Sequence, residues 1–242
     1  MHPAVAVLVA YLCGSIPAAY LAGRAHGVDL RKHGSGNLGA TNVVRVLGAK
    51  VGALVFAFDV AKGALPVALL PPWVAVPRPD LWAIAFGLAA ILGHVRPVFL
   101  LGRGGGKGVA TASGVFLALA PVPMLAALAT FAGVLYATGY VSLGSLSGAV
   151  VLPLALLVTR GPTSPLFLIS GAVAAFVFWT HRANIGRLRR GEEHRFGRRG
   201  GTNEPPTTER DPKSPAPPAP VDRRIRRRLD DHERRQQPRE GC

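Results

Sequence analysis

Residues 109–137 read VATASGVFLALAPVPMLAALATFAGVLYA and contain no charged side chain. As a single helix they would be about 43 Å long, which exceeds the hydrocarbon thickness of a bilayer, about 30 Å. Pro121 and Pro123 lie near the middle, where each ring removes a backbone donor and breaks or kinks a helix. The stretch therefore predicts two short helices that meet at these prolines and extend to Gly105 and Gly139.

The rest of the first 181 residues has the same apolar character. A membrane-spanning helix needs roughly 20 apolar residues, and further runs cover residues 3–23, 51–71, 81–101, 143–158 and 164–181. Residues 1–181 hold 11 Lys and Arg but only 3 Asp and Glu, too few acids for the surface of a soluble domain. We therefore expect an all-α polytopic membrane protein, with seven transmembrane helices if the first stretch is split and six if it is not.

The distribution of positive charge decides between six and seven helices. Basic residues gather in residues 24–50, 102–108 and 182–199, whereas residues 72–80 and 159–163 hold one arginine each. Cytoplasmic loops carry an excess of Lys and Arg. The seven-helix arrangement puts every basic-rich segment on one side, so we expect the N-terminus outside and the C-terminus in the cytoplasm.

Residues 200–242 are a different kind of sequence, rich in proline and arginine. Such a segment cannot bury enough apolar surface to fold alone, so we expect a membrane domain over residues 1–199 and a disordered cytoplasmic tail over residues 200–242. The plainest interpretation of the tail is a solvated extension, and attraction to anionic lipid headgroups is an alternative. Nucleic-acid binding is disfavoured because no aromatic residues lie between the arginines to stack on bases.

The first basic segment contains a polar loop, RKHGSGNLGATNVVR, at residues 31–45. Its glycines let the backbone approach a ligand, and its side chains are neutral donors and one permanent cation. The candidate ligand-binding residues are Gly34, Ser35, Gly36, Asn37, Gly39, Thr41, Asn42 and Arg45. Thr41 or Asn42 could also cap a short helix over residues 43–48 and aim its N-terminus at an anion. A polar turn between two helices is the plainer interpretation.

The second basic segment, GRGGGKG at residues 102–108, leads directly into an apolar run. A glycine-rich loop that opens a helix is suited to phosphate, and a lysine adds a charge. The candidate phosphate-binding residues are Gly105, Gly106, Lys107 and Gly108. This is not a Walker A loop, because Leu101 takes the place of its first glycine and no Ser or Thr follows the lysine. An ATPase is therefore disfavoured.

Two later segments add polar groups on the same side of the membrane. Ser142 begins a helical run, where it could face the same site or simply cap or pack the helix. His181 and Asn184 close the last run on one helical face, since they are three residues apart. A histidine at a membrane boundary is often an interfacial anchor, but beside Asn184 and several arginines it also suits an oxyanion. The four segments predict a site for an anionic ligand with phosphate-like groups, reached from the cytoplasm.

The order of these motifs resembles the bacterial acyl-phosphate:glycerol-3-phosphate acyltransferases over residues 1–196. The matching residues are Gly14-Ser15-Ile16-Pro17, the loop from Gly34 to Arg45, Gly93-His94 with Pro97, Gly105-Gly106-Lys107-Gly108-Val109-Ala110-Thr111, and His181-Arg182-Ala183-Asn184-Ile185 through Gly191 and Glu193. The resemblance implies a multi-pass enzyme of the bacterial cell (inner) membrane with its active site on the cytoplasmic face. Such enzymes transfer a fatty acyl chain from acyl phosphate to the 1-hydroxyl of glycerol 3-phosphate, which gives lysophosphatidic acid in the first step of phospholipid synthesis.

The resemblance also implies roles for individual residues. The catalytic residues would be Ser35, Arg45, Lys107, His181 and Asn184, and the substrate-binding residues Gly34, Gly36, Asn37, Gly39, Thr41, Asn42, Gly105, Gly106, Gly108 and Ser142. Glu193 would be a structural member of the last motif. The chain departs from the usual pattern at Leu38, where proline is common, and at Arg96, where an aromatic residue is common. Residues 102–107 are one glycine longer than usual, which leaves the register of Arg103 open.

The chemistry so implied is direct transfer, because an acyl phosphate already carries a good leaving group. We expect His181 to position a phosphate or the attacking hydroxyl; general base catalysis by His181 and proton transfer to a substrate phosphate oxygen are the alternatives. An upstream acyl-phosphate-forming enzyme would supply the donor. No cofactor or metal is expected, and neither Cys13 nor Cys242 indicates a disulfide or a metal site.

Two other classes of protein fit less well. A transporter for an organic phosphate would place its ligands near the bilayer midplane, whereas the apolar runs are almost free of polar groups. A membrane adaptor that only displays its basic tail would leave the organised loops unexplained.

Overall fold

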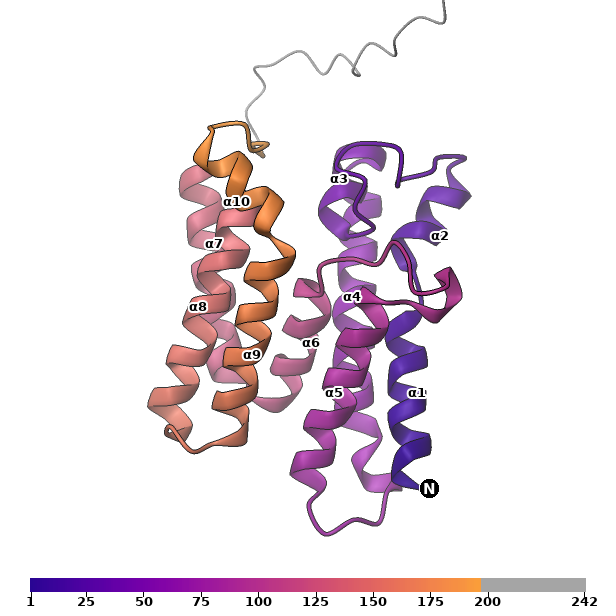
Figure 1. Ribbon diagram of the computed structural model, residues 1–242, viewed down its shortest axis with the longest axis vertical. Coiled ribbons are helices and arrows are strands. Elements are labelled where there is room, and N and C mark those ends of the chain that lie inside the picture. The colour runs from indigo at the N-terminus through magenta and orange to yellow at the C-terminus, as the bar shows by residue number, and fades with distance from the viewer. Residues whose placement is uncertain (197–242) are drawn as a thin grey trace, which may run out of the picture. The chain divides into compact units, whose positions relative to one another are not determined.

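The computed structural model describes residues 1–196, and in this part of the chain the regular structure is entirely helical (Figure 1). The elements in chain order are α1 (Pro3–Ser15), α2 (Ala18–Ala25), α3 (Ala40–Leu47), α4 (Ala49–Leu69), the 3-10 turn η1 (Pro71–Trp73), α5 (Pro79–Val95), the 3-10 turn η2 (Val98–Leu100), α6 (Val109–Leu119), α7 (Pro121–Thr138), α8 (Val141–Arg160), α9 (Pro165–Thr180) and α10 (Arg182–Arg189). The all-α prediction is confirmed for these residues. The predicted tail, residues 200–242, lies outside them.

The predicted break within residues 109–137 is confirmed, but α6 begins at Val109 and does not extend back to Gly105. Helix α6 ends at Leu119 and α7 begins at Pro121, joined by the fully buried Ala120. Pro121 occupies the first helical position, where its missing N–H leaves no hydrogen bond unmade. Gly139 ends α7 in the left-handed conformation, with φ of 76°, which is the usual role of glycine at this position.

The helices differ in their capacity to cross a membrane. Five spans in the described part of the chain are long and apolar enough, and the pair α9 and α10, bent by 59°, would make a sixth. Helix α6 has 11 residues and a length of about 16 Å, roughly half of a hydrocarbon core. The structure therefore has five or six candidate spans and one short apolar helix, and the seven-span topology stays a prediction.

Neighbouring helices approach each other closely at glycine. A Cβ added at Gly14 would overlap the carbonyl of Ala90, where α1 packs on α5, and one at Gly114 would overlap the carbonyl of Val60, where α6 packs on α4. Small residues at such crossings let membrane helices gain van der Waals contact. Helix α7 packs on α8, and α8 on α9, as a second group of neighbours (Figure 1).

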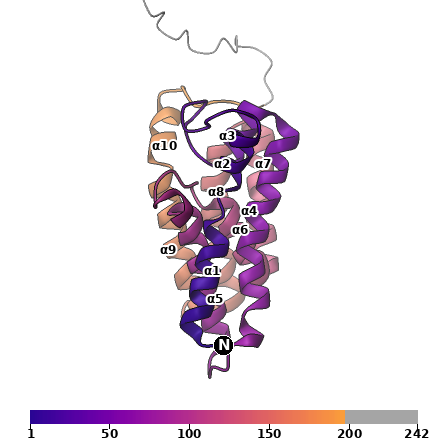
Figure 2. The same cartoon turned by 90° about the vertical axis from the view of Figure 1, so that its right-hand side faces the viewer.

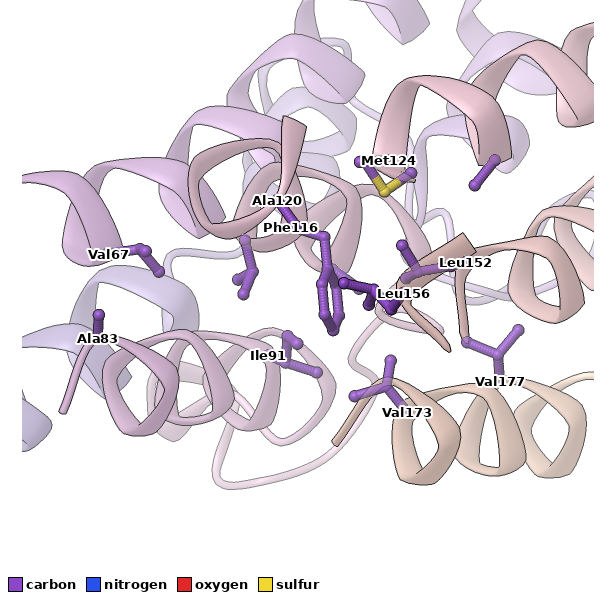
Figure 3. Close-up of a cluster of buried hydrophobic side chains, with 13 residues drawn as sticks. Val67, Ala83, Ile91, Phe116, Ala120, Met124, Leu152, Leu156, Val173 and Val177 are labelled. Carbon is purple, nitrogen blue, oxygen red and sulfur yellow. The ribbon is translucent and has the colours of Figure 1, made fainter. Parts of the chain in front are cut away.

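A cluster of buried apolar side chains joins the two groups of helices. Figure 3 shows Phe116 of α6 among Ile91 of α5, Leu156 of α8 and Val173 of α9. Phe116 and Leu156 are among the largest fully buried side chains of the described residues. The polar loops lie at the other end of the molecule from the N-terminus, where α2, α3 and α10 gather (Figures 1 and 2).

Candidate functional site

A cleft of about 1290 Å³, partly open to solvent, extends from the polar loops into the space between the later helices. The predicted site residues that line it are Ser35, Asn37, Gly39, Thr41, Asn42, Arg45, Lys107, Gly108, Ser142, His181 and Asn184. Four predicted glycines are absent from its lining and shape the loops behind it: Gly34, Gly36, Gly105 and Gly106. Four segments that are far apart in the sequence thus meet at one cleft.

The carboxylate of Glu193 is the centre of a hydrogen-bond network at one wall of the cleft. Its Oε1 accepts from Ser142 Oγ at 2.9 Å and from Asn184 Nδ2 at 2.7 Å, while its Oε2 accepts from Arg187 Nε at 2.7 Å. Burial alone would raise the pKa of Glu193, but the hydrogen bonds from Asn184, Arg187 and Ser142 lower it overall. The residue is therefore a buried anion that fixes the start of α8 to the end of the described chain.

Lys107 is attached to this network through Asn184. Its Nζ donates to Asn184 Oδ1, and Asn184 in turn donates to Glu193. The pKa of Lys107 is lowered to about 8, mainly by burial and also by the charges of Arg187 and Arg45, against the opposing effect of Glu193. A half-buried ammonium with two neighbouring guanidinium groups creates a positive region suited to an anion.

Arg45 contributes the second cation of the cleft, from the last turn of α3. Its Nε is buried and has no hydrogen-bond partner among the described residues. Burial lowers the pKa of the Arg45 guanidinium, and the charge of Arg187 acts in the same direction, against the opposing effect of Glu193. A buried donor without a partner is energetically unfavourable, so this N–H is suited to a ligand oxygen in the cleft.

His181 is held at the end of α9, with its side chain buried. Its Nδ1 lies 2.8 Å from the carbonyl oxygen of Val177. A carbonyl can only accept, so the neutral ring carries its proton on Nδ1 and keeps Nε2 as an acceptor. The ring therefore offers the cleft an acceptor nitrogen in a fixed orientation.

Asn42 organises the first loop from within. Its Nδ2 donates to the carbonyls of Leu30 at 3.2 Å and His33 at 3.1 Å, and its Oδ1 accepts from the amide of Ser35 at 2.8 Å. Gly34 packs directly on this amide group with a φ of 62°, so a Cβ there would overlap Asn42 Oδ1. The side-chain hydrogen bonds of Asn42 are used inside the loop, which holds the exposed Ser35 at the mouth of the cleft.

The short helix after this loop begins earlier than the sequence indicated. Helix α3 covers Ala40–Leu47 and has Gly39 as its N-cap, without a side-chain cap. The expectation that Thr41 or Asn42 caps a helix over residues 43–48 is therefore wrong. Asn42 does not cap because its side chain hydrogen-bonds to three backbone groups of the preceding loop.

Two basic residues of the loops lie away from the cleft. Arg31 forms an ion pair with Asp29 at 2.9 Å and stacks over the ring of Tyr20. Arg103 is exposed and is absent from the lining of the cleft. Among the loop cations, Arg45 and Lys107 are thus the ones that the fold brings into the cleft.

The deeper part of the cleft is apolar. Its lining there comes from three helices: Met124, Leu128 and Phe131 of α7, Gly148 and Leu152 of α8, and Val173 and Val177 of α9. The cleft thus has a cationic, hydrogen-bonding head and an apolar continuation between helices. This shape fits an amphiphile whose anionic end lies at the loops.

Sequence reasoning missed several polar residues of the cleft wall. Asp59 and His94 line it from the membrane helices α4 and α5, and Ser113 and Ser170 from α6 and α9. His94 belongs to the Gly93-His94 motif of the resemblance but was not expected in the site, and the other three stand in apolar runs. Asp59 lies three residues before Lys62, and the two form an ion pair at 2.7 Å.

Comparison with known proteins identifies relatives of this chain. A family model described as "Glycerol-3-phosphate acyltransferase" matches residues 4–191. The glycerol-3-phosphate acyltransferase of Geobacter sulfurreducens is 48% identical over 189 residues, which cover 78% of this chain and 94% of the relative. That of Aquifex aeolicus is 44% identical over 191 residues, 78% of this chain and 97% of the relative.

Two solved structures share the fold. A crystal structure of PlsY, an integral membrane glycerol 3-phosphate acyltransferase in its glycerol 3-phosphate form, is 40% identical with a TM-score of 0.75, and the match covers 81% of this chain and 96% of that one. The lysophosphatidic acid form is 38% identical with a TM-score of 0.72, covering 81% and 95%.

Proposed function

Because this chain belongs to the glycerol-3-phosphate acyltransferase family, we propose that it transfers a fatty acyl group from acyl phosphate to the 1-hydroxyl of sn-glycerol 3-phosphate. The products would be lysophosphatidic acid and phosphate. Membership of the family makes the protein an integral membrane acyltransferase of phospholipid synthesis. The related structures with glycerol 3-phosphate and with lysophosphatidic acid support the proposed acceptor and product.

The observation that carries this proposal is the two-part character of the cleft. Arg45 supplies a permanent positive charge at the loops, Lys107 with its pKa of about 8 is mostly protonated at neutral pH, and an apolar channel continues from them between α7, α8 and α9. An acyl phosphate needs both parts, because its phosphate is anionic and its chain is a hydrocarbon. A donor of this kind would enter from the bilayer with its phosphate at the loop end.

The proposed reaction is a direct displacement. The 1-hydroxyl oxygen attacks the acyl carbonyl carbon, the new ester bond forms, and the bond from that carbon to the phosphate oxygen breaks, with phosphate leaving with the electron pair. Lys107 and Arg45 stabilise the negative charge of both phosphates, and Ser35 donates from the first loop. Asn184 acts by orienting the ammonium group of Lys107.

The proton of the attacking hydroxyl needs an acceptor in this cleft. Because Nδ1 of His181 faces the Val177 carbonyl, its Nε2 is suited to accept a hydrogen bond from the hydroxyl rather than to donate one to a phosphate. We therefore assign His181 to positioning the hydroxyl. The proton is taken up by this nitrogen or by an oxygen of the departing phosphate, which gains basicity as it leaves.

The proposed setting is the bacterial inner membrane, with seven spans and the N-terminus outside. In this arrangement α6, only about 16 Å long, counts as a short seventh span, α7 returns from Ala120, and the cleft opens to the cytoplasm, where basic loops gather. An enzyme that forms acyl phosphates would supply the donor. Residues 200–242 would extend on the cytoplasmic side, where their arginines could approach anionic headgroups.

The test is product formation by the purified protein in detergent or in a lipid cubic phase. Glycerol 3-phosphate is supplied with palmitoyl phosphate, with palmitoyl-CoA or with no donor, and lysophosphatidic acid is measured. We expect product from palmitoyl phosphate alone. Product from palmitoyl-CoA at an equal rate would overturn the choice of donor, and no product from a folded protein would overturn the assigned reaction and favour phosphate transport.

A further inference from the structure

A buried ion pair lies in the membrane part of α4, behind the glycine-rich loop. Asp59 Oδ1 and Lys62 Nζ are 2.7 Å apart, and their side chains are 2% and 3% exposed. Ionisable residues within a membrane span are rare and tend to have a functional reason. The proposed reaction uses neither residue directly, so the reason for this pair has to come from what surrounds it.

The lysine of the pair hydrogen-bonds to the backbone between the first two helices. Lys62 Nζ donates to the carbonyl oxygen of Ile16 at 2.9 Å. Ile16 and Pro17 separate α1 from α2, and this carbonyl also accepts from the amide of Ala18 at 3.1 Å. The pair thus joins α4 to the point where the chain turns toward the polar loops.

The aspartate of the pair faces a histidine that supports the glycine-rich loop. His94 Nδ1 lies 3.6 Å from Asp59 Oδ1, and the His94 side chain is 6% exposed. The His94 carbonyl accepts from the amide of Gly106 at 3.3 Å. A Cβ at Gly106 would overlap Nε2 of the His94 ring, so the loop backbone lies directly against this ring.

Lys107 is the next residue after this contact. Lys62 contacts Asp59, Asp59 faces the His94 ring, and this ring packs against the backbone of Gly106, which precedes Lys107. Asp59 also has an Oδ2 atom that is buried without a hydrogen-bond partner among the described residues. The charge of Asp59 can therefore orient the His94 ring at the point where both residues reach the wall of the cleft.

We propose that Asp59, Lys62 and His94 are positioning residues that hold the backbone of Gly106 so that Lys107 meets the phosphate of the substrate. This inference rests on the proposed function, since it takes the phosphate at Lys107 as given. The Lys107 ammonium is fixed on its other side by Asn184. The loop is thus held from the membrane interior and from the cytoplasmic network at once.

The first variant replaces the pair by apolar side chains of similar size, as Asp59→Leu together with Lys62→Met. Replacing both partners avoids leaving one buried charge alone, and such replacements are often tolerated. The second variant, His94→Gln, keeps a polar side chain of similar reach under Gly106 but removes the ring nitrogen that faces Asp59. It is the smaller change and keeps the test open if the double variant does not fold.

The measurement is the affinity for glycerol 3-phosphate, from the ligand-induced rise in unfolding temperature in detergent, together with KM and kcat with palmitoyl phosphate. We expect both variants to bind at least about tenfold more weakly, because the charge-assisted hydrogen bond from Lys107 to the phosphate is weakened or lost when the ammonium group is displaced. The same changes in a Lys107→Gln background should alter affinity by less than about twofold, because no ammonium is left to position.

The control is Arg78→Gln, which removes an exposed ion pair with Asp80, 3.1 Å long, at the other end of α5. It should leave affinity unchanged. An equal loss of affinity with and without Lys107, an equal loss in Arg78→Gln, or no loss in either cluster variant would overturn the proposal. The proposed function fails separately, if the wild-type protein itself neither binds glycerol 3-phosphate nor forms product.

Discussion

Removal of the negative charge of Glu193 should lower both the stability and the enzymatic activity of the protein. In Glu193→Gln the remaining oxygen can still accept from Ser142 and Asn184, but an amide NH₂ then faces Arg187 Nε, which it cannot accept from. Hydrogen bonds to charged groups contribute about 1.5–3 kcal/mol each. Arg187 is 35% exposed and can turn to water, so we expect a loss near the lower end, about 2 kcal/mol of unfolding free energy.

Glu193→Ala should be worse, because it also leaves the buried donors of Ser142 and Asn184 without an acceptor. A loss of about 3–5 kcal/mol follows from breaking a buried pair in this way. Activity should fall at least about tenfold in both variants, because Asn184 is then free to move and with it the ammonium of Lys107.

The neighbouring residue provides a matched control. Glu192 forms an ion pair with Arg190 of the same length, 2.7 Å, but both side chains are more than half exposed. Exposed pairs contribute about 0.2–1 kcal/mol, so Glu192→Gln should change stability by about 0.5 kcal/mol or less and leave activity intact. Thermal unfolding in detergent and lysophosphatidic acid formation are the assays. Equal effects of the two Gln substitutions would refute the reasoning, since it depends on burial and on the contacts of Glu193.

Three further perturbations test other parts of the structure. The pKa of Lys107 is about 8, and its protonated amine binds phosphate. At pH values above about 7, where the phosphate of the ligand is mostly doubly ionised, the affinity for glycerol 3-phosphate measured by titration calorimetry should therefore fall as the pH rises through about 8. Lys107→Arg, which stays charged, should not show this decline, and an unchanged decline would assign it to another group. Asn42→Asp keeps an acceptor for the Ser35 amide but places a carboxylate against two carbonyl oxygens. The loop should lose about 1–3 kcal/mol of stabilisation, and the KM for the phosphate substrates should rise about tenfold; an unaltered KM would show that the loop does not depend on these hydrogen bonds. Gly114→Ala should lower the unfolding free energy by about 1–3 kcal/mol, because the new methyl group meets the Val60 carbonyl. Gly133→Ala has open space around it and should raise the unfolding free energy by up to about 1 kcal/mol; similar unfolding temperatures for the two variants would contradict the close crossing of α4 and α6.

Much of the fold could be predicted from the sequence, because a membrane helix requires a long run of apolar residues. Run length and hydropathy predicted the helical regions, and the prolines at 121 and 123 predicted the break between α6 and α7. Helix starts were less accessible. Asn42 is a good N-cap by type, yet its contacts with Leu30, His33 and Ser35 occupy its side chain, and these depend on how the loop closes.

The candidate site was accessible to the extent that phosphate-binding residue types cluster in short segments. Ser35, Arg45, Lys107, His181 and Asn184 stand in glycine-rich or basic stretches, and all five line one cleft. His94 and Asp59 also line it, but they lie within apolar runs, where the local sequence does not indicate that a polar side chain faces the cleft.

Hydropathy, charge and helix-breaking residues act over a few positions, so they are enough to predict a helical membrane protein with basic loops and phosphate-binding residue types. Which of these residues work together depends on how the helices pack. Lys107 and Asn184 are 77 positions apart, and Ser142 and Glu193 are 51 apart. Such contacts form because helix packing brings distant segments together, and the spacing of residues along the chain does not predict how the helices pack.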